Sequence, residues 1–496
     1  MTTIPVTRRP PPLPDGFAIT LDDGARQLTD ELLFGGSPAR VLRLTAAGRA
    51  AWCELETGPV ASPAAGALAR RLTDAGLAHP VPPPGPDRRT DLTVVIPVRD
   101  RPVLLDRCLT ALGGRHLVIV VDDGSRDPDA VARAVHRHGA TLIRRPVNGG
   151  PGAARDTALE AVTSDLVAFI DSDCVPPPGW ADRLAAHFAD PAVAAVAPCI
   201  TARADGTGAG RFARANESLG LGGQPGRVVP RTRISYVPTA ALVARAAALT
   251  AVARDGAVFD AAMRVGEDVD LVWRLHEQGW RIRYDPAVRV GHHEPPTWRG
   301  LLERRFRYGT SVAPLAQRHP GAVPPLVLHP WPAVTVAALL AGRPFAAAAA
   351  FGASNLVMLR TLRQAGVPTE GTPRAMLDAV RQTWLGTGRY ATQFAAPALA
   401  ALIVAGGRRR RLAAASLLLG PAFNTWRERR PDLGPARYAL GSIADDVAYG
   451  AGVWTGCWKA RTLAPVRPLV AWRPLRIDRP QTAVTPERRR SRSPSR

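Results

Sequence analysis

Short apolar runs alternate with amphipathic stretches between residues 90 and 173, a spacing that predicts strands alternating with helices. The first run, 92–98, is continuous and rich in β-branched residues, as expected of a parallel strand buried on both faces. Similar runs follow at 116–123, 141–146 and 165–173. This order predicts βαβ units, hence an α/β fold with a parallel sheet, and a functional site at the carboxyl ends of its strands.

Acidic residues follow two of these runs directly. Asp122 and Asp123 end the second run, and Asp171 and Asp173 end the fourth. Side chains two positions apart on a strand point to opposite faces, so Asp171 and Asp173 can hold one ligand only if the chain turns there. The prolines at 176–178 favour such a break. Carboxylate oxygens suit Mg²⁺ or Mn²⁺ bridging to substrate phosphates, whereas the alternative is a solvated acidic loop.

A glycine-rich turn at 148–152 leads into a helical stretch. We expect its backbone amides to point outward and, with the helix N-terminus, to bind a diphosphate. The alternative is a plain glycine turn. The GxGxxG fingerprint is absent here, and the turn at 98–101 lacks glycine, which argues against a nicotinamide or flavin enzyme.

Glu267 and Asp268 begin another predicted helix. Acids at a helix start often serve only as caps, and this interpretation suits Glu267. A catalytic base must be a carboxylate held beside the acceptor hydroxyl, and Asp268 suits that role, with Trp273 as a wall for the acceptor. His292 and His293 follow a predicted strand and are candidate metal ligands.

Five segments in this order resemble the family 2 glycosyltransferases, which have a GT-A fold, over residues 91 to about 310. The matching segments are VVIPVRD (94–100), VVDDGS (120–125), NGGPGAARD (148–156), FIDSDC (169–174) and GEDVDLVWR (266–274). The resemblance implies transfer of a sugar from a UDP-sugar donor, with inversion at the anomeric carbon and assistance from Mg²⁺ or Mn²⁺.

The resemblance also implies roles for residues that match its motifs. The residues that would bind the nucleotide sugar are Pro97, Arg99, Asp100, Asp122, Asp123, Gly152, Arg155, Asp171 and Arg307. Asp171 and Asp173 would hold the metal, with His292 as a third candidate ligand. Asp268 would be the catalytic base, with Glu267 as the second candidate.

Residues 304–308 stand where processive relatives carry a Gln-x-x-Arg-Trp motif. Arg304 and Tyr308 replace the Gln and the Trp, which puts polymer synthesis in doubt. Arg307 is expected to reach the diphosphate. The alternative is a basic amphipathic helix on the surface.

The first 85 residues predict a separate small domain. Helical patterns cover about 46–56 and 63–75, after hairpin-like runs, and a short strand near 76–80 closes the unit. In pattern it resembles the PqqD-like, winged-helix-type domains that recognise precursor peptides of modified natural products. Residues 81–89 predict a stiff, proline-rich linker.

The pairing of these two domains resembles the mycofactocin-system glycosyltransferases. That family decorates a peptide-derived redox cofactor with a short oligosaccharide of β-linked glucose, so the resemblance implies such an acceptor. The expected organisation is a PqqD-like acceptor-recognition domain at 1–85, a GT-A domain at 90–318, a hydrophobic helical region at 319–480 and a disordered basic tail at 481–496.

The net charge of the chain is +22, but Lys459 is the single lysine among its 64 basic residues. Together with heavy use of alanine, proline and glycine, this indicates a compositional bias, so the basicity is weak evidence for nucleic acid and no such partner is expected. The five cysteines show no CxxC or zinc-site spacing. The first residues lack the apolar segment of a signal peptide, and none is expected.

Three stretches near the C-terminus carry no Asp, Glu, Lys or Arg: 320–342, 344–359 and 390–407. They are broken by proline or fall short of the roughly 20 apolar residues that a spanning helix needs. The arginines at 408–411 and in the last residues suit an anionic cytoplasmic leaflet. We therefore expect attachment to the cytoplasmic face of a bacterial cell membrane. The alternative is a cytoplasmic protein with buried helices.

Three other functions stay open at this point. A family 2 transferase could act on a cell-envelope lipid or polysaccharide instead. A nucleotidyltransferase shares the fold type and the metal carboxylates but needs no base at Asp268. A non-catalytic nucleic-acid-binding protein would leave Asp171, Asp173 and Asp268 without a purpose, and its binding would depend steeply on salt.

Overall fold

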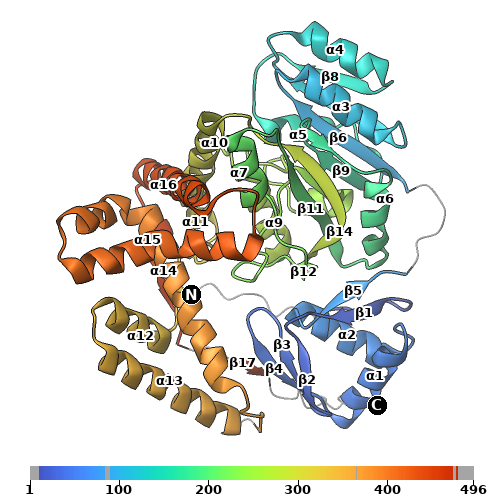
Figure 1. Ribbon diagram of the computed structural model, residues 1–496. Coiled ribbons are helices and arrows are strands. Elements are labelled where there is room, and N and C mark those ends of the chain that lie inside the picture. Colours follow the sequence, from blue (N-terminus) through green and yellow to red (C-terminus); the bar gives the residue numbers. More distant parts are fainter. Residues whose placement is uncertain (1–9, 84–89, 365, 473–475, 479–496) are drawn as a thin grey trace, which may run out of the picture.

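The computed structural model describes residues 10–83, 90–364, 366–472 and 476–478. Its centre is a nine-stranded sheet in the order β10-β14-β11-β13-β9-β6-β7-β8, with β12 paired to β14 (Figure 1). The strands are β6 (Leu92–Val98), β7 (Leu117–Asp123), β8 (Thr141–Arg145), β9 (Leu166–Ile170), β10 (Cys174–Val175), β11 (Val193–Arg203), β12 (Gly226–Arg227), β13 (Ala241–Arg245) and β14 (Arg281–His293).

The first half of this sheet is parallel and contains the four predicted strands. β6 pairs in parallel with β7 and β9, and β7 pairs in parallel with β8. Helices α3 (Pro102–Leu112), α4 (Pro128–Arg137) and α5 (Pro151–Leu159) form the connections. Every residue of β6 is buried because a separate apolar core packs on each face, with Val95 in one core and Val94 in the other.

The second half of the sheet is mixed, which corrects the expectation of a parallel sheet. β13 runs antiparallel to both β9 and β11, while β11 and β14 are parallel. The short strands β10 and β12 run antiparallel to β14. The alternation of apolar runs ends near residue 173, and pairing direction depends on strands distant in sequence, so no sequence pattern indicated the direction of these strands.

The N-terminal region has its own small sheets and two helices. β1 (Ala18–Leu21) pairs with β5 (Ala78–Val81), and β2 (Arg26–Thr29), β3 (Leu32–Gly35) and β4 (Arg40–Arg43) form a second sheet. The predicted helices are confirmed as α1 (Ala46–Thr57) and α2 (Pro63–Ala75), each begun by a hydroxyl cap, Thr45 or Ser62. Its identity as a PqqD-like domain stays a prediction.

Buried and half-buried ion pairs attach this N-terminal region to the domain that contains the large sheet. Arg70 and Asp190 form a fully buried pair at 2.7 Å, and Arg281 on β14 pairs with Asp74 at 2.7 Å. A short strand near the C-terminus, β17 (Arg476–Asp478), adds in parallel to β4. Most of the predicted linker, 84–89, lies outside the described residues.

The C-terminal region is helical. Its helices are α10 (Trp298–Thr310), α11 (Val312–Arg318), α12 (Pro330–Leu340), α13 (Pro344–Gln364), α14 (Thr372–Ala405), α15 (Arg408–Arg429) and α16 (Pro435–Ala460). Within the described part of the chain, α13 is the one helix long and apolar enough to cross a membrane, by length and composition only. The predicted basic tail, 481–496, is outside the described residues.

Glycines bring the backbones of α10 and α16 into direct contact. A Cβ atom on Gly452 of α16 would overlap the carbonyl oxygen of Phe306 on α10, and one on Gly309 of α10 would overlap that of Tyr449. At Gly456 the Cβ would lie 2.6 Å from the carbonyl oxygen of Thr310. Because each obstacle is backbone, a larger residue can be accommodated only if the helices separate.

We therefore expect Gly452→Ala to lower the free energy of unfolding by about 1–3 kcal/mol, the usual cost of overpacking. Gly352 is the matched control, because it also lies inside a helix, α13, with nothing near its Cβ position. Gly352→Ala should leave stability unchanged or raise it by about 0.5–1 kcal/mol. Urea unfolding followed by circular dichroism measures both, and equal stability of the two variants would contradict the close contact.

Candidate active site

The chain turns at residues 171–173, the DSD segment, as its sequence predicted. The backbone N–H of Cys174 donates to the carbonyl oxygen of Asp171 at 2.9 Å, which closes a tight turn after β9. β10 then pairs with β14 and brings Asp173 beside His292, with 3.5 Å between Oδ1 and Nε2. Asp171 and Asp173 consequently line the same cleft.

Arg155 links this turn to the helix of the candidate base. Its Nη2 donates to Asp171 at 2.7 Å and its Nη1 donates to Glu267 at 3.0 Å, while the side chain is 2% exposed. Burial opposes the charge of Arg155, but Asp171 and Glu267 outweigh this effect and raise its pKa. Arg155, predicted to bind the nucleotide sugar, is thus an internal cation that joins α5 to α9 (Glu267–Glu277).

Glu267 and Asp268 differ in their surroundings at the start of α9. Glu267 pairs with Arg155, so it does more than complement the helix dipole. Asp268 accepts hydrogen bonds from the backbone N–H groups of Val269, at 2.8 Å, and Thr239, at 3.4 Å. Burial raises the pKa of Asp268 and, with the nearby charge of Asp268, raises the pKa of Glu267 to about 7.

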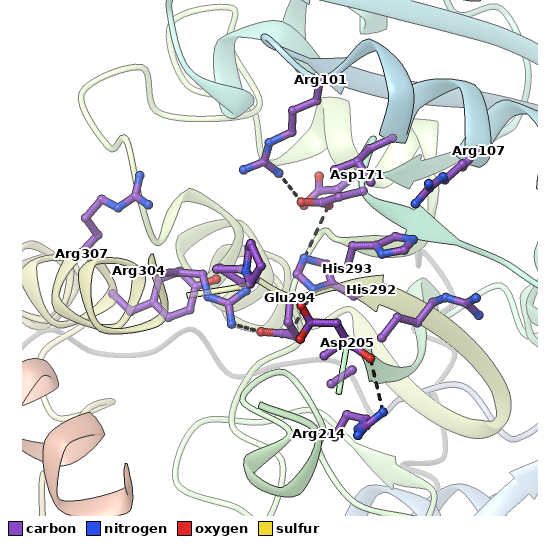
Figure 2. A pocket seen from close by; sticks show the side chains of 18 of the residues that line it. Arg101, Arg107, Asp171, Asp205, Arg214, His292, His293, Glu294, Arg304 and Arg307 are labelled. Atoms are coloured by element: carbon purple, nitrogen blue, oxygen red, sulfur yellow. Dashed lines mark hydrogen bonds and ion pairs between the residues drawn. The ribbon is translucent and has the colours of Figure 1, made fainter. Parts of the chain in front are cut away.

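Two cavities meet at the turn. The first measures about 1020 Å³ and includes Asp171, Asp173 and His292 in its lining (Figure 2). The second, about 670 Å³, includes Glu267 and Asp268. The residues shared by both linings are Asp171, Val265, His292 and Tyr308. A donor in one cavity and an acceptor in the other would therefore come together beside Asp171.

The first cavity is rich in arginine. Figure 2 shows these side chains around the acidic centre, and those in the lining are Arg101, Arg107, Arg203, Arg214, Arg304 and Arg307. Arg101 pairs with Asp173, and Arg304 pairs with Glu294. Arg307 lies in the lining, on α10, which packs against α16 and is therefore not a free surface helix, and its contact with a diphosphate stays a prediction.

The contacts of Asp171, Asp173 and His292 indicate how well these side chains suit a metal ion. Glu294 lies 3.0 Å from Nδ1 of His292, the type of carboxylate partner that metal-binding imidazoles commonly have. Burial alone would lower the pKa of His292, but Glu294 and Asp173 outweigh it and raise this pKa. Among the residues the structure describes, no three His, Cys, Asp or Glu side chains converge as a metal site. The donors present fit Mg²⁺ or Mn²⁺ only in a site that substrate phosphates complete.

The glycine-rich turn differs from its predicted role. The N–H groups of Gly149 and Gly150 donate to the carboxylate of Asp123, at 2.9 and 2.7 Å, rather than pointing outward to a diphosphate. Asp123 also pairs with Arg145 at 2.9 Å. A Cβ atom on Gly152 would lie 3.0 Å from Cβ of Phe259 and 3.2 Å from Cγ of Glu267, so this glycine permits α5 to lie close to both side chains.

The other residues predicted to bind the nucleotide lie on the neighbouring strand ends. Asp122 is buried and pairs with Arg144 at 2.6 Å, and Pro97 is buried in β6. Oδ1 of Asp100 accepts a hydrogen bond from the backbone N–H of Arg126 at 2.8 Å. Nε of Arg99 lies 3.7 Å from Oδ2 of Asp100. In the described chain these residues and Asp123 lie outside the linings of both cavities, and their nucleotide-binding role stays a prediction.

Several aromatic side chains contribute to the lining of the second cavity. Trp273 lines it, and its indole N–H donates to the carbonyl oxygen of Ser235 at 2.7 Å, while its contact with an acceptor stays a prediction. Tyr236 and Tyr449 also line it, and the guanidinium of Arg305 lies 4.6 Å from the ring centre of Tyr449. No local sequence pattern marks Tyr236, Arg305 or Tyr449 as site residues, and Tyr449 is 181 residues from Asp268 and 278 from Asp171.

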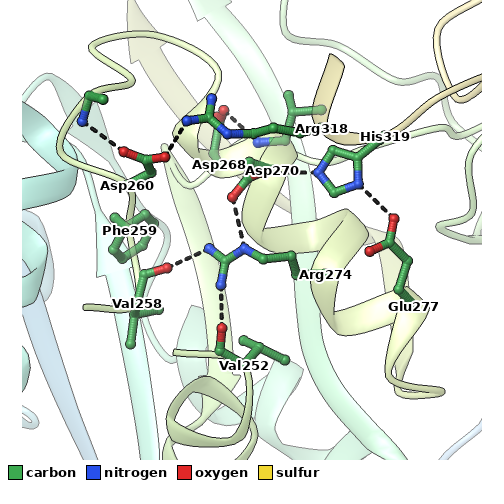
Figure 3. Close-up of polar contacts among 12 residues, drawn as sticks. Val252, Val258, Phe259, Asp260, Asp268, Asp270, Arg274, Glu277, Arg318 and His319 are labelled. Atoms are coloured by element: carbon green, nitrogen blue, oxygen red, sulfur yellow. Dashed lines mark hydrogen bonds and ion pairs between the residues drawn. The ribbon is translucent and has the colours of Figure 1, made fainter. Parts of the chain in front are cut away.

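A buried polar network holds α9 in place (Figure 3). Asp270 accepts from Arg274 at 2.8 Å, and Arg274 also donates to backbone carbonyls of the preceding loop. His319, just after α11, lies 3.0 Å from Asp270 and 2.6 Å from Glu277. Asp270, Arg274 and Glu277 belong to α9, the helix that carries Asp268. Their contacts with the preceding loop and with His319 therefore fix the position of the candidate base.

Comparison with known proteins identifies the family of the chain. The family model for glycosyl transferase family 2 matches residues 93–249. The chain is 39% identical over 478 residues to the pre-mycofactocin glycosyltransferase of Mycobacterium tuberculosis, which covers 92% of this chain and 98% of that protein. This chain belongs to the family of pre-mycofactocin glycosyltransferases. It is thus a glycosyltransferase, and the family predicted from its motifs is confirmed.

Other proteins are similar to a smaller part of this pre-mycofactocin glycosyltransferase homologue. The succinoglycan biosynthesis protein ExoW of Rhizobium meliloti is 45% identical over 95 residues, which are 17% of this chain and 30% of that protein. A mannosyltransferase from Pyrobaculum calidifontis, solved with GDP-Man and Mn²⁺, is 20% identical with a TM-score of 0.45, covering 76% of this chain and 89% of that one.

We predict that Arg155→Met lowers the free energy of unfolding by about 3–5 kcal/mol, because it leaves Asp171 and Glu267 as uncompensated charges. Arg299→Met is the control, since Arg299 pairs with Glu303 on the exposed surface of α10 and should leave the melting temperature unchanged. Thermal and urea unfolding measure both variants. Equal stability of Arg155→Met and the unsubstituted protein would show that the buried cation is dispensable.

Proposed function

We propose that this enzyme transfers a hexose from a UDP-sugar to pre-mycofactocin, with inversion at the anomeric carbon. Glucose is the hexose that we expect. The observation that carries the proposal is Asp268, a half-buried carboxylate that lines the second cavity and has no ion-pair partner in the described chain. The first cavity, rich in arginine, meets the second beside Asp171. This arrangement suits a donor diphosphate on one side and a nucleophilic hydroxyl on the other.

The donor diphosphate would lie in the first cavity. Arg307 and Arg107 line it without an ion-pair partner among the described residues, so their charges are available to phosphate oxygens. Asp171 and Asp173 would hold Mg²⁺ or Mn²⁺ with the diphosphate, and the cation would neutralise charge on the departing UDP. Before the donor binds, Arg101 and Arg155 occupy oxygens of these two carboxylates.

Asp268 would take the proton of the acceptor hydroxyl. In a single displacement the hydroxyl attacks the anomeric carbon opposite UDP, and a carboxylate must accept its proton as the bond forms. The raised pKa of Asp268 increases its basicity relative to an exposed carboxylate. Glu267 is less suited to this task because Arg155 already engages its carboxylate.

The acceptor would lie in the second cavity, against Trp273, Tyr236 and Tyr449. Flat aromatic walls suit sugar rings and aromatic groups of a peptide-derived molecule. The M. tuberculosis relative is named for pre-mycofactocin, and its similarity extends over the N-terminal region and the C-terminal helices. We infer that the N-terminal region recognises this acceptor. A cell-envelope lipid or polysaccharide is the alternative acceptor that a substrate comparison would test.

Asp268→Asn tests the base. It keeps size and hydrogen bonding but cannot accept the proton, so kcat should fall by about 10² to 10⁴ while the affinity for UDP-glucose stays nearly constant. Proton NMR of the product of the unsubstituted enzyme should show a β linkage from the α-linked donor. Glu267→Gln is the comparison. Its melting temperature is measured as well, because this substitution also removes the ion pair with Arg155. A larger kcat loss in Glu267→Gln at equal stability would move the base to Glu267, and an α-linked product would reject inversion.

Asp173→Asn tests the metal. Calorimetric titration of UDP should show binding that Mn²⁺ strengthens in the unsubstituted protein, and this strengthening should disappear in the variant. Asp205→Asn is the control, because Asp205 lines the same cavity but hydrogen-bonds within its own loop, to Thr207. Equal UDP affinity with Mn²⁺ and with EDTA, or full turnover in EDTA, would exclude a metal-assisted donor site.

A further inference from the structure

Helices α12 to α15 expose an unusual number of large apolar side chains. Phe345 is 90% exposed and Val404 75%, and the others include Leu339, Leu377 and Leu412. Soluble surfaces carry such residues singly, whereas apolar residues that recur over neighbouring helices indicate an interaction site. Figure 1 shows α12 and α13 at the edge of the molecule, away from the nine-stranded sheet. This surface, residues 330–429, is called the helical arm below.

The charge of the helical arm is strongly positive. It contains twelve arginines against three acidic residues, Glu370, Asp378 and Glu428. Four of the arginines, Arg408–Arg411, begin α15, and the structure shows no ion pair for them in the described chain. A partner for this surface must therefore be apolar and anionic. A second copy of the arm fits poorly, because two such surfaces would repel each other.

An apolar cavity of about 510 Å³ opens between α12, α14 and α15. Val336, Leu339, Leu377 and Leu412 contribute apolar walls, and Arg381 and Arg409 lie in the same lining. Hydrocarbon walls with guanidinium groups beside them match a lipid, whose acyl chain is apolar and whose phosphate is anionic.

The dimensions of α13 favour a helix that lies on a bilayer over one that crosses it. Its uncharged stretch, 344–359, is followed by Arg360 and Arg363 within the same helix. At 1.5 Å per residue this stretch is about 24 Å long, shorter than the roughly 30 Å hydrocarbon core. Arg343 precedes the helix, so both ends of the apolar stretch carry charge that belongs at the headgroup level.

We propose that the helical arm docks the enzyme on an anionic lipid surface. The apolar side chains of α12 and α13 would enter the boundary between headgroups and acyl chains, and Arg408–Arg411 would contact lipid phosphates. Exposed apolar side chains flanked by arginines can hold a helix at this boundary without its crossing the bilayer. The surface is separate from both cavities of the active site, so docking does not depend on the identity of donor or acceptor.

Flotation of the purified full-length protein with vesicles tests the proposal, in the absence of any substrate. The probes are vesicles of phosphatidylcholine alone and vesicles with about a third of phosphatidylglycerol. Binding to the anionic vesicles should exceed binding to the neutral ones by about ten-fold or more and should weaken at high salt. Washing with alkaline carbonate should release the protein.

Three variants assign the binding to the arm. Phe345→Glu, and separately glutamine at all four of Arg408–Arg411, should each reduce binding about ten-fold or more, with unchanged melting temperature because these side chains are exposed. Leu117→Glu is the control, since Leu117 is 74% exposed at the start of β7 and should have no effect.

Three results would overturn the proposal: no binding to either vesicle, equal loss of binding in the arm and control variants, or resistance to carbonate, which would indicate a spanning helix. Dimerisation through the arm in light scattering, abolished by Phe345→Glu, would identify a second copy as its partner instead. Because no donor or acceptor is present, none of these outcomes bears on the transfer reaction.

Discussion

The buried cation of Arg155 is the constraint on which the active site depends. It stands between a carboxylate of the DSD turn and a carboxylate of α9, and its close contacts with these two groups stabilise the buried guanidinium. Gly152, one turn earlier, has no Cβ, which lets α5 approach α9 closely enough for the guanidinium to span the gap. The candidate metal-binding turn and the helix of the candidate base thus have one fixed separation.

Internal pairing also explains why the glycine-rich turn was misjudged. Glycine, a helix N-terminus and a nearby strand end are features of an anion site, and here the anion is Asp123 of the same chain. The carboxylate satisfies the amides of Gly149 and Gly150 and organises the loop from within. A local pattern can indicate that amides converge, but it cannot distinguish a bound phosphate from an acidic side chain that lies 26 residues earlier in the sequence.

The parts of the fold that sequence predicted are those with local signals. β-Branched runs indicated β6, β7 and β9, and hydroxyl caps preceded α1 and α2. The antiparallel pairing of β13 with β9 and β11 had no such signal, because pairing direction depends on distant strands. In the site, acidic motifs marked Asp171 and Asp268, whereas Tyr449 enters the second cavity only through packing of α16 on α10.

That packing has a consequence for how such an enzyme can evolve. One side of α10 presents Arg304 and Arg307 to the first cavity, while its glycine contacts join it to α16, which supplies Tyr449 to the second. The domain boundary expected near residue 318 therefore does not separate two independent parts of the active site, because α10 and α16 lie on opposite sides of it and pack together. Recombination at that point would separate the donor cavity from a wall of the neighbouring cavity. Exchange of whole modules between family members would have to carry α10 and α16 together, so these two helices should be inherited as a pair.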